Sequence, residues 1–209
     1  MTVVALSPGA NVSWLGSLTR IVTTLVLPVA LAWGFVHFLH GRLHRGDIRE
    51  VPAIAAAPGP ITLRVKLPGH HAGIAEPIVV LGRSGQAVMV YLKLFPHNQV
   101  RIGIEFWGRR SDESALFSVP CAEAQLAITC FLPALFPPEG DPQWGGVPAR
   151  LQTLRRTRYY LTVDRVVRLT APVDYPMDPH PNLYLGLNPL GGSIVSDRFT
   201  GSILNASAH

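Results

Sequence analysis

The sequence lacks most of the motifs through which enzymes and redox proteins do chemistry. It has only two cysteines, Cys121 and Cys130, and no Cys-x-x-Cys pair, which excludes cysteine-pair zinc sites and thioredoxin-like redox motifs. It has neither a Walker-type phosphate loop nor a dinucleotide glycine fingerprint. No Ser-His-Asp or Cys-His arrangement can be placed. These absences favour a binding or structural protein over an enzyme.

Acidic residues are also few and scattered. Glycoside hydrolysis needs two carboxylates a few ångströms apart, but Glu76, Glu105 and Glu123 are each isolated on their own predicted strands. Asp112 and Glu113 are adjacent, so they would point to opposite faces of a strand, and "RRSDES" is typical of a turn. No cluster of oxygen ligands suits calcium. We therefore expect no catalytic residues and no metal site.

One long stretch contains no charged residue. Residues 21–41 carry no Asp, Glu, Lys or Arg, and at about 1.5 Å per residue they span roughly 32 Å as a helix. Pro28 lies mid-span and would kink it. A cleaved signal peptide fits poorly, since no positive charge occurs in the first nineteen residues. The pattern predicts a short N-terminal segment (residues 1–17) and a transmembrane helix over residues 18–41.

The flanks of this stretch predict its orientation. Arg42, Arg45 and Arg49 follow it, whereas only Arg20 precedes it. The positive-inside rule therefore places the N-terminus outside and the C-terminal domain in the cytoplasm, on an inner or intracytoplasmic membrane.

Trp33, His37, His40 and His44 lie within about 60° of one another on a helical wheel. One interpretation is that His37 or His40 ligates haem or bacteriochlorophyll in the membrane. The residues four positions earlier are bulky, which leaves little room for a macrocycle. We therefore interpret the four residues as a partner-facing stripe and expect no cofactor, with ligation as the minority hypothesis.

After a basic juxtamembrane segment and Ala/Pro linker (residues 42–60), short runs of β-type residues recur about every ten positions. "ITLRVKL", "AVMVYLKLF" and "QVRIGIEFW" alternate apolar and polar residues, and Gly, Pro, Asn and Asp separate the runs. No comparable stretch has a convincing helical period. The pattern predicts an all-β antiparallel sandwich or jelly roll over residues 61–209.

The C-terminal stretch "NLYLGLNPLGGSIVSDRFTGSI" resembles the closing strands of concanavalin A-like and laminin-G-like domains, in which the last strand returns beside the first. The preceding hairpin also resembles theirs, although Asp164-Arg165 stands where Asp-Gly is usual. The matching residues are Tyr184, Gly186, Asn188, Gly191, Gly192, Phe199, Gly201 and Ile203. The resemblance implies a fold of this kind, and many of its relatives bind glycans. Exposed aromatic residues would serve such binding, and the candidates are Trp107, Trp144, Tyr159 and Tyr160.

A basic cluster of Arg150, Arg155, Arg156 and Arg158 precedes the "YYLTV" strand. It is either a solvated surface or a site that docks onto an acidic protein partner or anionic headgroups. No aromatic-basic motif of a nucleic-acid-binding module occurs, so nucleic acid is not an expected partner.

Together these features predict a non-enzymatic single-pass subunit that stabilises a larger membrane complex. The Trp33/His37/His40 side would face other membrane subunits, and the arginines would contact acidic surfaces. With its histidine-tryptophan stripe, the chain resembles an accessory subunit of a bacterial photosynthetic reaction-centre and light-harvesting complex. The alternative is a membrane-tethered glycan-binding, lectin-like module. A periplasmic domain with a Cys121–Cys130 disulfide would favour that alternative over two ordinary buried thiols.

Overall fold

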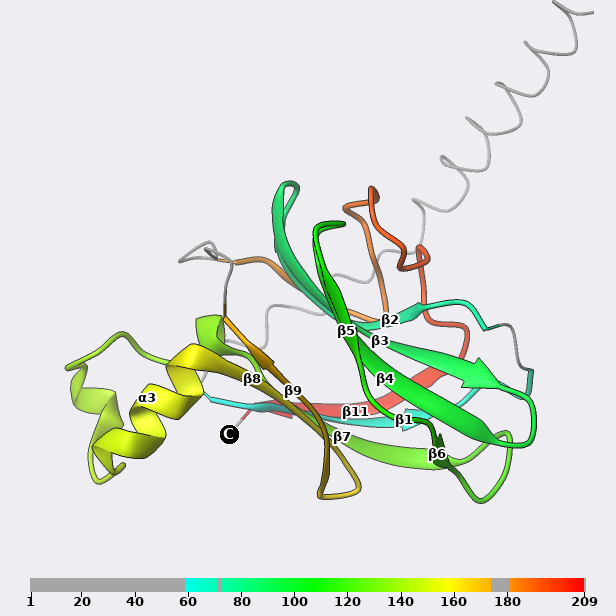
Figure 1. Cartoon of the computed structure of the whole chain (residues 1–209), viewed down its shortest axis with the longest axis horizontal. Coiled ribbons are helices and arrows are strands. Elements are labelled where there is room, and N and C mark those ends of the chain that lie inside the picture. The colour runs from blue at the N-terminus through cyan, green and yellow to red at the C-terminus, as the bar shows by residue number, and fades with distance from the viewer. Residues whose placement is uncertain (1–58, 71–72, 174–180, 209) are drawn as a thin grey trace, which may run out of the picture. The chain divides into compact units, whose positions relative to one another are not determined.

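One layer of the molecule is a five-stranded antiparallel sheet, and buried residues alternate with more exposed ones in its three central strands (Figure 1). In β1 (Ile61–Lys66) and β8 (Arg158–Val163) every second residue is buried, because successive side chains of a strand point to opposite faces. The strand order is β11-β1-β7-β8-β9, with β7 at Gln125–Phe131, β9 at Val166–Pro172 and β11 at Ser202–Ala208.

The second layer is a six-stranded antiparallel sheet in the order β10-β2-β3-β4-β5, with the short β6 paired to β4. Its central strands are buried along nearly their whole length, which means that both of their faces are covered. The strands are β2 (Glu76–Arg83), β3 (Gln86–Phe95), β4 (Gln99–Phe106), β5 (Ser111–Glu113), β6 (Phe117–Ser118) and β10 (Leu183–Leu185).

The structure is a computed structural model that describes residues 59–70, 73–173 and 181–208. The main core lies between the two sheets and is built from aliphatic side chains of both, such as Leu63 and Ile102. The prediction of an all-β antiparallel sandwich is confirmed.

A covering segment, residues 186–201, lies over the outer face of the six-stranded sheet and forms a second, smaller core there. Val195 of this segment packs with Val80 of β2 and with Met89 and Tyr91 of β3. Two buried carboxylates hold the segment. Glu76 accepts hydrogen bonds from the backbone N–H and hydroxyl of Thr200 (2.9 and 2.8 Å), and Glu105 accepts from the N–H of Ile194 (3.2 Å).

The hairpin and closing-strand predictions are also confirmed. Asp164 and Arg165 both have positive φ (50° and 67°), as a two-residue turn between β8 and β9 requires. Strand β11 pairs with β1, so the last strand returns beside the first. At Gly201 an added Cβ would overlap the carbonyl oxygen of Lys66, so only glycine permits this approach of the backbones.

Two local predictions were wrong. "RRSDES" contains a strand, β5, because Ser111–Glu113 pairs with β4. The basic cluster lies partly on a helix, α3 (Ala149–Thr157), which Pro148 precedes. The predicted strand at Glu76 is present as β2, but its buried residues do not alternate, because its outer face lies under the covering segment instead of in water.

Of the two predicted thiols, Cys130 is buried, but Cys121 is exposed, and both are free. Burial raises the pKa of Cys130 to about 12, so this thiol stays protonated near neutral pH. The disulfide considered from the sequence is therefore not formed.

Several predictions concern residues outside the described part of the chain. They are the transmembrane helix over residues 18–41, with its Pro28 kink, and the stripe of Trp33, His37, His40 and His44, and they stay predictions. Within the described ranges, no helix has both the length and the apolar character needed to cross a bilayer.

Candidate functional site

Polar side chains stand in rows across strands β3, β4 and β5 on the outer face of the six-stranded sheet. Tyr91, Gly103 and Glu113 are register partners in one row, and Lys93 pairs with Arg101 in the next. Because Gly103 has no side chain, the ring of Tyr91 can lie over it, where an added Cβ would overlap that ring. This glycine lets a tyrosine on β3 reach a glutamate on β5 across the intervening strand.

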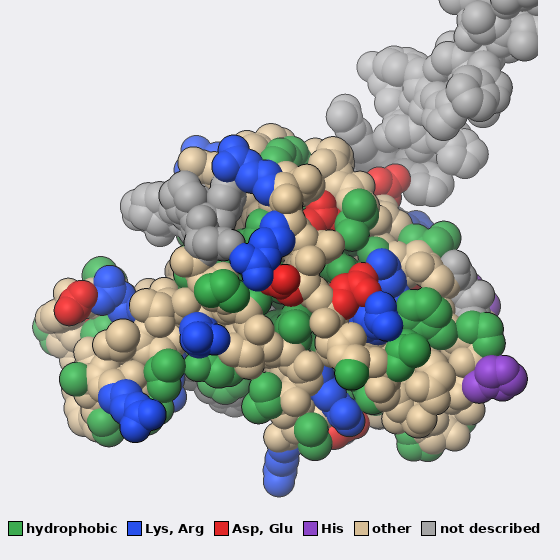
Figure 2. All heavy atoms as spheres, viewed as in Figure 1, with side chains coloured by type: hydrophobic (Ala, Val, Ile, Leu, Met, Phe, Trp, Pro, Cys, Tyr) green, Lys and Arg blue, Asp and Glu red, His purple; other side chains and the backbone are tan. Residues whose placement is uncertain are grey.

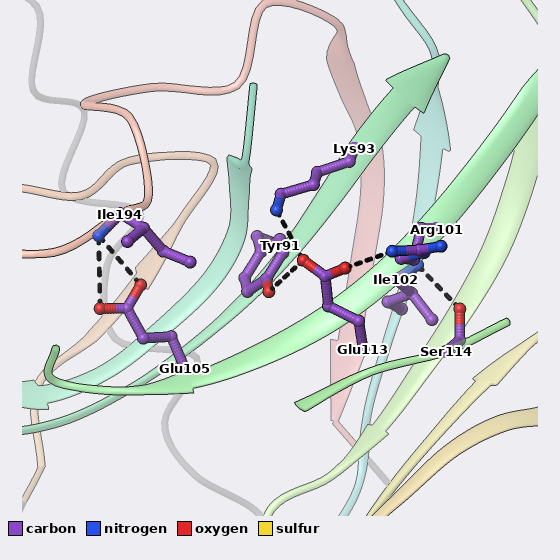
Figure 3. A network of polar contacts seen from close by, with 8 residues as sticks. All are labelled: Tyr91, Lys93, Arg101, Ile102, Glu105, Glu113, Ser114 and Ile194. Atoms are coloured by element: carbon purple, nitrogen blue, oxygen red, sulfur yellow. Dashed lines mark hydrogen bonds and ion pairs between the residues drawn. The ribbon is translucent and has the colours of Figure 1, made fainter. Parts of the chain in front are cut away.

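Three donors converge on the carboxylate of Glu113, as Figure 3 shows. Tyr91 Oη and Lys93 Nζ donate to Oε1 (3.0 and 2.6 Å), and Arg101 Nη1 donates to Oε2 (2.7 Å). The side chains of Lys93, Arg101 and Glu113 are 22%, 33% and 21% exposed, so water reaches the network from one side. Acidic and basic side chains accordingly lie side by side near the centre of Figure 2.

The network shifts the pKa of two of its members. Burial alone would raise the pKa of Glu113, but the hydrogen bonds from Lys93, Arg101 and Tyr91 outweigh it and lower this pKa to about 2. Burial and then the hydrogen bond to Glu113 raise the pKa of Tyr91, which stays a neutral donor. Glu113 is thus a fixed anionic acceptor, and a carboxyl without a proton cannot act as a glycosidase's general acid.

Beside this network lies a hollow of about 180 Å³ between the β4–β5 turn and the covering segment. Glu105 is at its base and accepts a hydrogen bond from the Gly108 N–H (2.8 Å) as well as from Ile194. Arg110 bonds to Asp112 through Nη2 (3.1 Å). The lining residues are Glu105, Gly108, Arg109, Arg110, Ser111 and Ile194.

Trp107, directly before Gly108, has a backbone conformation that is rare for a bulky residue. Its φ is +43°, in the left-handed region, and its side chain is half-buried. The indole packs near Gly192 of the covering segment, and Gly108 leaves room for the carbonyl of the same glycine. The surrounding contacts hold this aromatic residue in a strained position next to the hollow.

Of the four aromatic candidates for glycan binding, the structure leaves two partly accessible. Tyr159 and Trp144 are buried, with 1% and 5% exposure. Trp107 and Tyr160 are half-buried, Trp107 near the hollow and Tyr160 on the outer face of the other sheet, where it packs edge-to-face against Phe131.

The predicted arginines lie on a different element and do not meet the network. Arg155 lies over the ring of Phe136 (5.6 Å), Arg156 pairs with Glu139 (2.5 Å), and Arg158 is exposed at the start of β8. Sequence reasoning missed Glu113, because only its pairing with β4 brings it to Tyr91, Lys93 and Arg101.

No protein-family model matches this sequence, and neither does any curated protein. Solved structures do match, among them one described as a Ruminococcus gnavus IT-sialidase CBM40 bound to alpha2,6 sialyllactose. The two chains are 10% identical, the alignment covers 71% of this chain and 73% of that one, and the TM-score is 0.42. The likeness concerns a sandwich-like arrangement of strands. No comparison supports the predicted scaffolding subunit or the resemblance to photosynthetic complexes.

Proposed function

We propose that this domain is a non-catalytic, concanavalin A-like glycan-binding module, and that its site is the hollow beside Trp107. The observation that carries the proposal is Trp107 itself, a half-buried aromatic residue held at φ +43°. A strained backbone costs on the order of 1–3 kcal/mol and clusters at ligand sites, where the surroundings hold it in place. Glycine would adopt this φ without strain, so the indole is kept at the expense of backbone strain, although it also packs against the smaller core under the covering segment.

The chemistry around Trp107 suits a sugar. A sugar offers hydroxyls that need fixed donors and acceptors, and C–H faces that pack on aromatic rings. Ser111 and Arg110 line the hollow, and the charged network of Glu113 stands in the next row of the same sheet. The hollow is smaller than the roughly 300–1,000 Å³ of sites for drug-sized ligands, which suits one terminal sugar unit.

Both carboxylates near the hollow have positioning roles in this proposal. Glu105 uses its oxygens on backbone N–H groups of Gly108 and Ile194 and so fixes two walls of the hollow. Glu113 is anionic and orients Lys93 and Arg101. Glu113, whose pKa is lowered to about 2, has no proton to give to a leaving group, so the proposal is binding without hydrolysis.

The test is Trp107→Gly in the full chain, screened against a panel of neutral and acidic oligosaccharides. Glycine relieves the left-handed strain while removing the indole, so affinity should fall at least about tenfold, or about 1.4 kcal/mol, without loss of folding. Arg165→Gly is the matched control, because it gives the same backbone relief at φ 67° in the β8–β9 turn. Wild-type protein that binds no glycan in the panel, or a Trp107→Gly variant that binds as well as wild type, would refute the proposal.

A further inference from the structure

The connection between β7 and β8 is far longer than the fold requires. These strands are antiparallel neighbours that pair up to Phe131 and Tyr160, so a turn of about two to five residues would join them. Instead the chain inserts residues 132–157, hereafter the β7–β8 insert, which includes helix α3 and projects beyond the sheets in Figure 1. Long connections of this kind in compact domains are usually functional.

The β7–β8 insert is braced by its own side chains. Phe136 and Trp144 stack with ring centroids 5.9 Å apart, and Trp144 Nε1 donates to the carbonyl of Pro138 (2.8 Å). Gln152 Nε2 donates to the carbonyl of Val147 (2.7 Å). No residue of α3 is buried, so this helix adds little to the core of the sandwich. The hydrogen bonds and ring stacking of the insert therefore hold an exposed surface in a fixed shape.

The insert carries three arginines and two acids, a net charge of +1, and its surface is partly apolar. Its two acids are already engaged, since Glu139 pairs with Arg156 and Asp141 accepts a hydrogen bond from the Gln143 N–H (2.8 Å). Arg150 and, directly after α3, Arg158 are exposed, and Leu151 is 44% exposed. Figure 2 shows basic side chains on this projecting part of the molecule.

We infer that the β7–β8 insert docks onto anionic lipid headgroups. Guanidinium groups of Arg150 and Arg158 match the geometry of phosphate and carboxylate groups. Leu151, directly after Arg150 and 44% exposed, adds an apolar side chain that can enter the headgroup region beside the arginine. This inference is independent of the glycan-binding proposal, because it uses a different element and a different ligand.

Lipid is favoured over an acidic protein because of what precedes the domain in the sequence. Residues 21–41 are predicted to span a bilayer, and residues 42–58 reach at most about 60 Å when extended. A bilayer is thus the anionic surface that the chain itself would keep within reach. Each arginine near such a surface contributes about 1 kcal/mol, and tethering makes weak contacts of this size sufficient.

The experiment places a reporter at the insert of the full chain. In a Cys121→Ser background, Ala149→Cys, an exposed position that leaves Arg150 and Leu151 in place, is labelled with a polarity-sensitive fluorophore, while Cys130 is buried and stays unlabelled. The protein is reconstituted into, or mixed with, vesicles of phosphatidylcholine alone or of phosphatidylcholine with phosphatidylserine. We expect a blue-shifted emission and an aqueous-quencher accessibility lower by about threefold only with phosphatidylserine, both reversed by high salt.

Charge-reversal variants test which arginines are responsible. Arg150→Glu combined with Arg158→Glu should abolish the shift, whereas Arg64→Glu, an exposed arginine of β1, should leave it unchanged. The same emission in both kinds of vesicle would overturn the inference. An equal loss with Arg64→Glu would do so too, because it would indicate attraction by net charge only. A shift that appears only when an acidic protein is added would point to a protein partner and also overturn it.

Discussion

The outer faces of the two sheets differ in what lies over them. The outer face of the five-stranded sheet is partly exposed, whereas the covering segment lies over that of the six-stranded sheet. On the five-stranded sheet, Thr62 and Thr129 share a hydrogen bond (3.1 Å), and Phe131 and Tyr160 pack edge-to-face at 6.5 Å, all partly exposed. On the six-stranded sheet, the covering segment buries carboxylates and a tyrosine beneath it. The covering segment is therefore the difference between the two faces. It adds a second layer over the six-stranded sheet, and charged side chains are fixed there instead of being solvated.

This second layer also explains where a ligand site can form. A polar group beneath it must find a partner, because an unpaired buried polar group costs about 1–3 kcal/mol. Glu76 and Glu105 find theirs in the backbone of the covering segment, while Glu113, which is partly exposed, has three side-chain donors. The resulting groups are rigid, as binding at a fixed geometry requires. Polar groups on the solvated outer face of the five-stranded sheet can bond to water, so they are not constrained in this way.

The largest expected effect comes from removing Glu76, one of the two buried carboxylates that hold the covering segment. Glu76→Ala leaves the N–H and hydroxyl of Thr200 without their acceptor, and we expect a loss of about 3 kcal/mol in the free energy of unfolding. Urea denaturation of the compact unit Glu50–His209 measures it. Glu123→Ala, which removes a surface carboxylate paired with Lys66, is the control and should leave the midpoint in place. Equal effects of the two substitutions would show that the covering segment is not clamped at Glu76.

The next largest expected effect concerns the close packing of the Tyr91 ring on Gly103, within the network around Glu113. Gly103→Ala drives a methyl group into the ring of Tyr91, and overpacking of this kind costs about 2 kcal/mol. In a Tyr91→Leu background the ring is gone, so the same substitution should cost less than about 0.5 kcal/mol. Denaturation of the four proteins gives the coupling. Additive effects would mean that the tyrosine ring does not rest on Gly103.

A smaller effect depends on pH. The folded-state pKa of Glu113, about 2, is below its ordinary value of 4.5, so its stabilising contribution is full above about pH 4.5 and is lost as the pH falls through 2. Glu113→Gln should therefore lose about 1.5 kcal/mol at pH 7 and almost nothing relative to wild type near pH 2. Urea denaturation from pH 2 to 7 follows both proteins. A difference that is constant over this range would contradict the assigned pKa.

The sequence predicted strands of both sheets, and the alternating pattern matches the observed burial best in the five-stranded one. β1 and β8 alternate because one face meets water, so their period of two is visible in the residues. β2 does not alternate, because a segment more than a hundred positions later covers it. The candidate site was predicted only in part, because Trp107 was among the aromatic candidates named from the sequence and Glu113 was not. Glu113 and Trp107 gain their roles from strand register and from the covering segment, which no local pattern encodes.

The smallest expected change in the free energy of unfolding concerns the solvated outer face of the five-stranded sheet. It gives the reference against which the effects on the covered face are compared. Thr62→Val and Thr129→Val each remove one hydroxyl of a partly exposed cross-strand pair. Water can replace the missing partner there, so each substitution should change the free energy of unfolding by less than about 0.5 kcal/mol, with a coupling of about 0.2–1 kcal/mol. A double-mutant cycle by urea denaturation measures that coupling. If it reached the size expected for Tyr91 and Gly103, then strand pairing alone would fix side chains as firmly as the second layer does. The contrast between the two faces would then have to come from charge and not from burial.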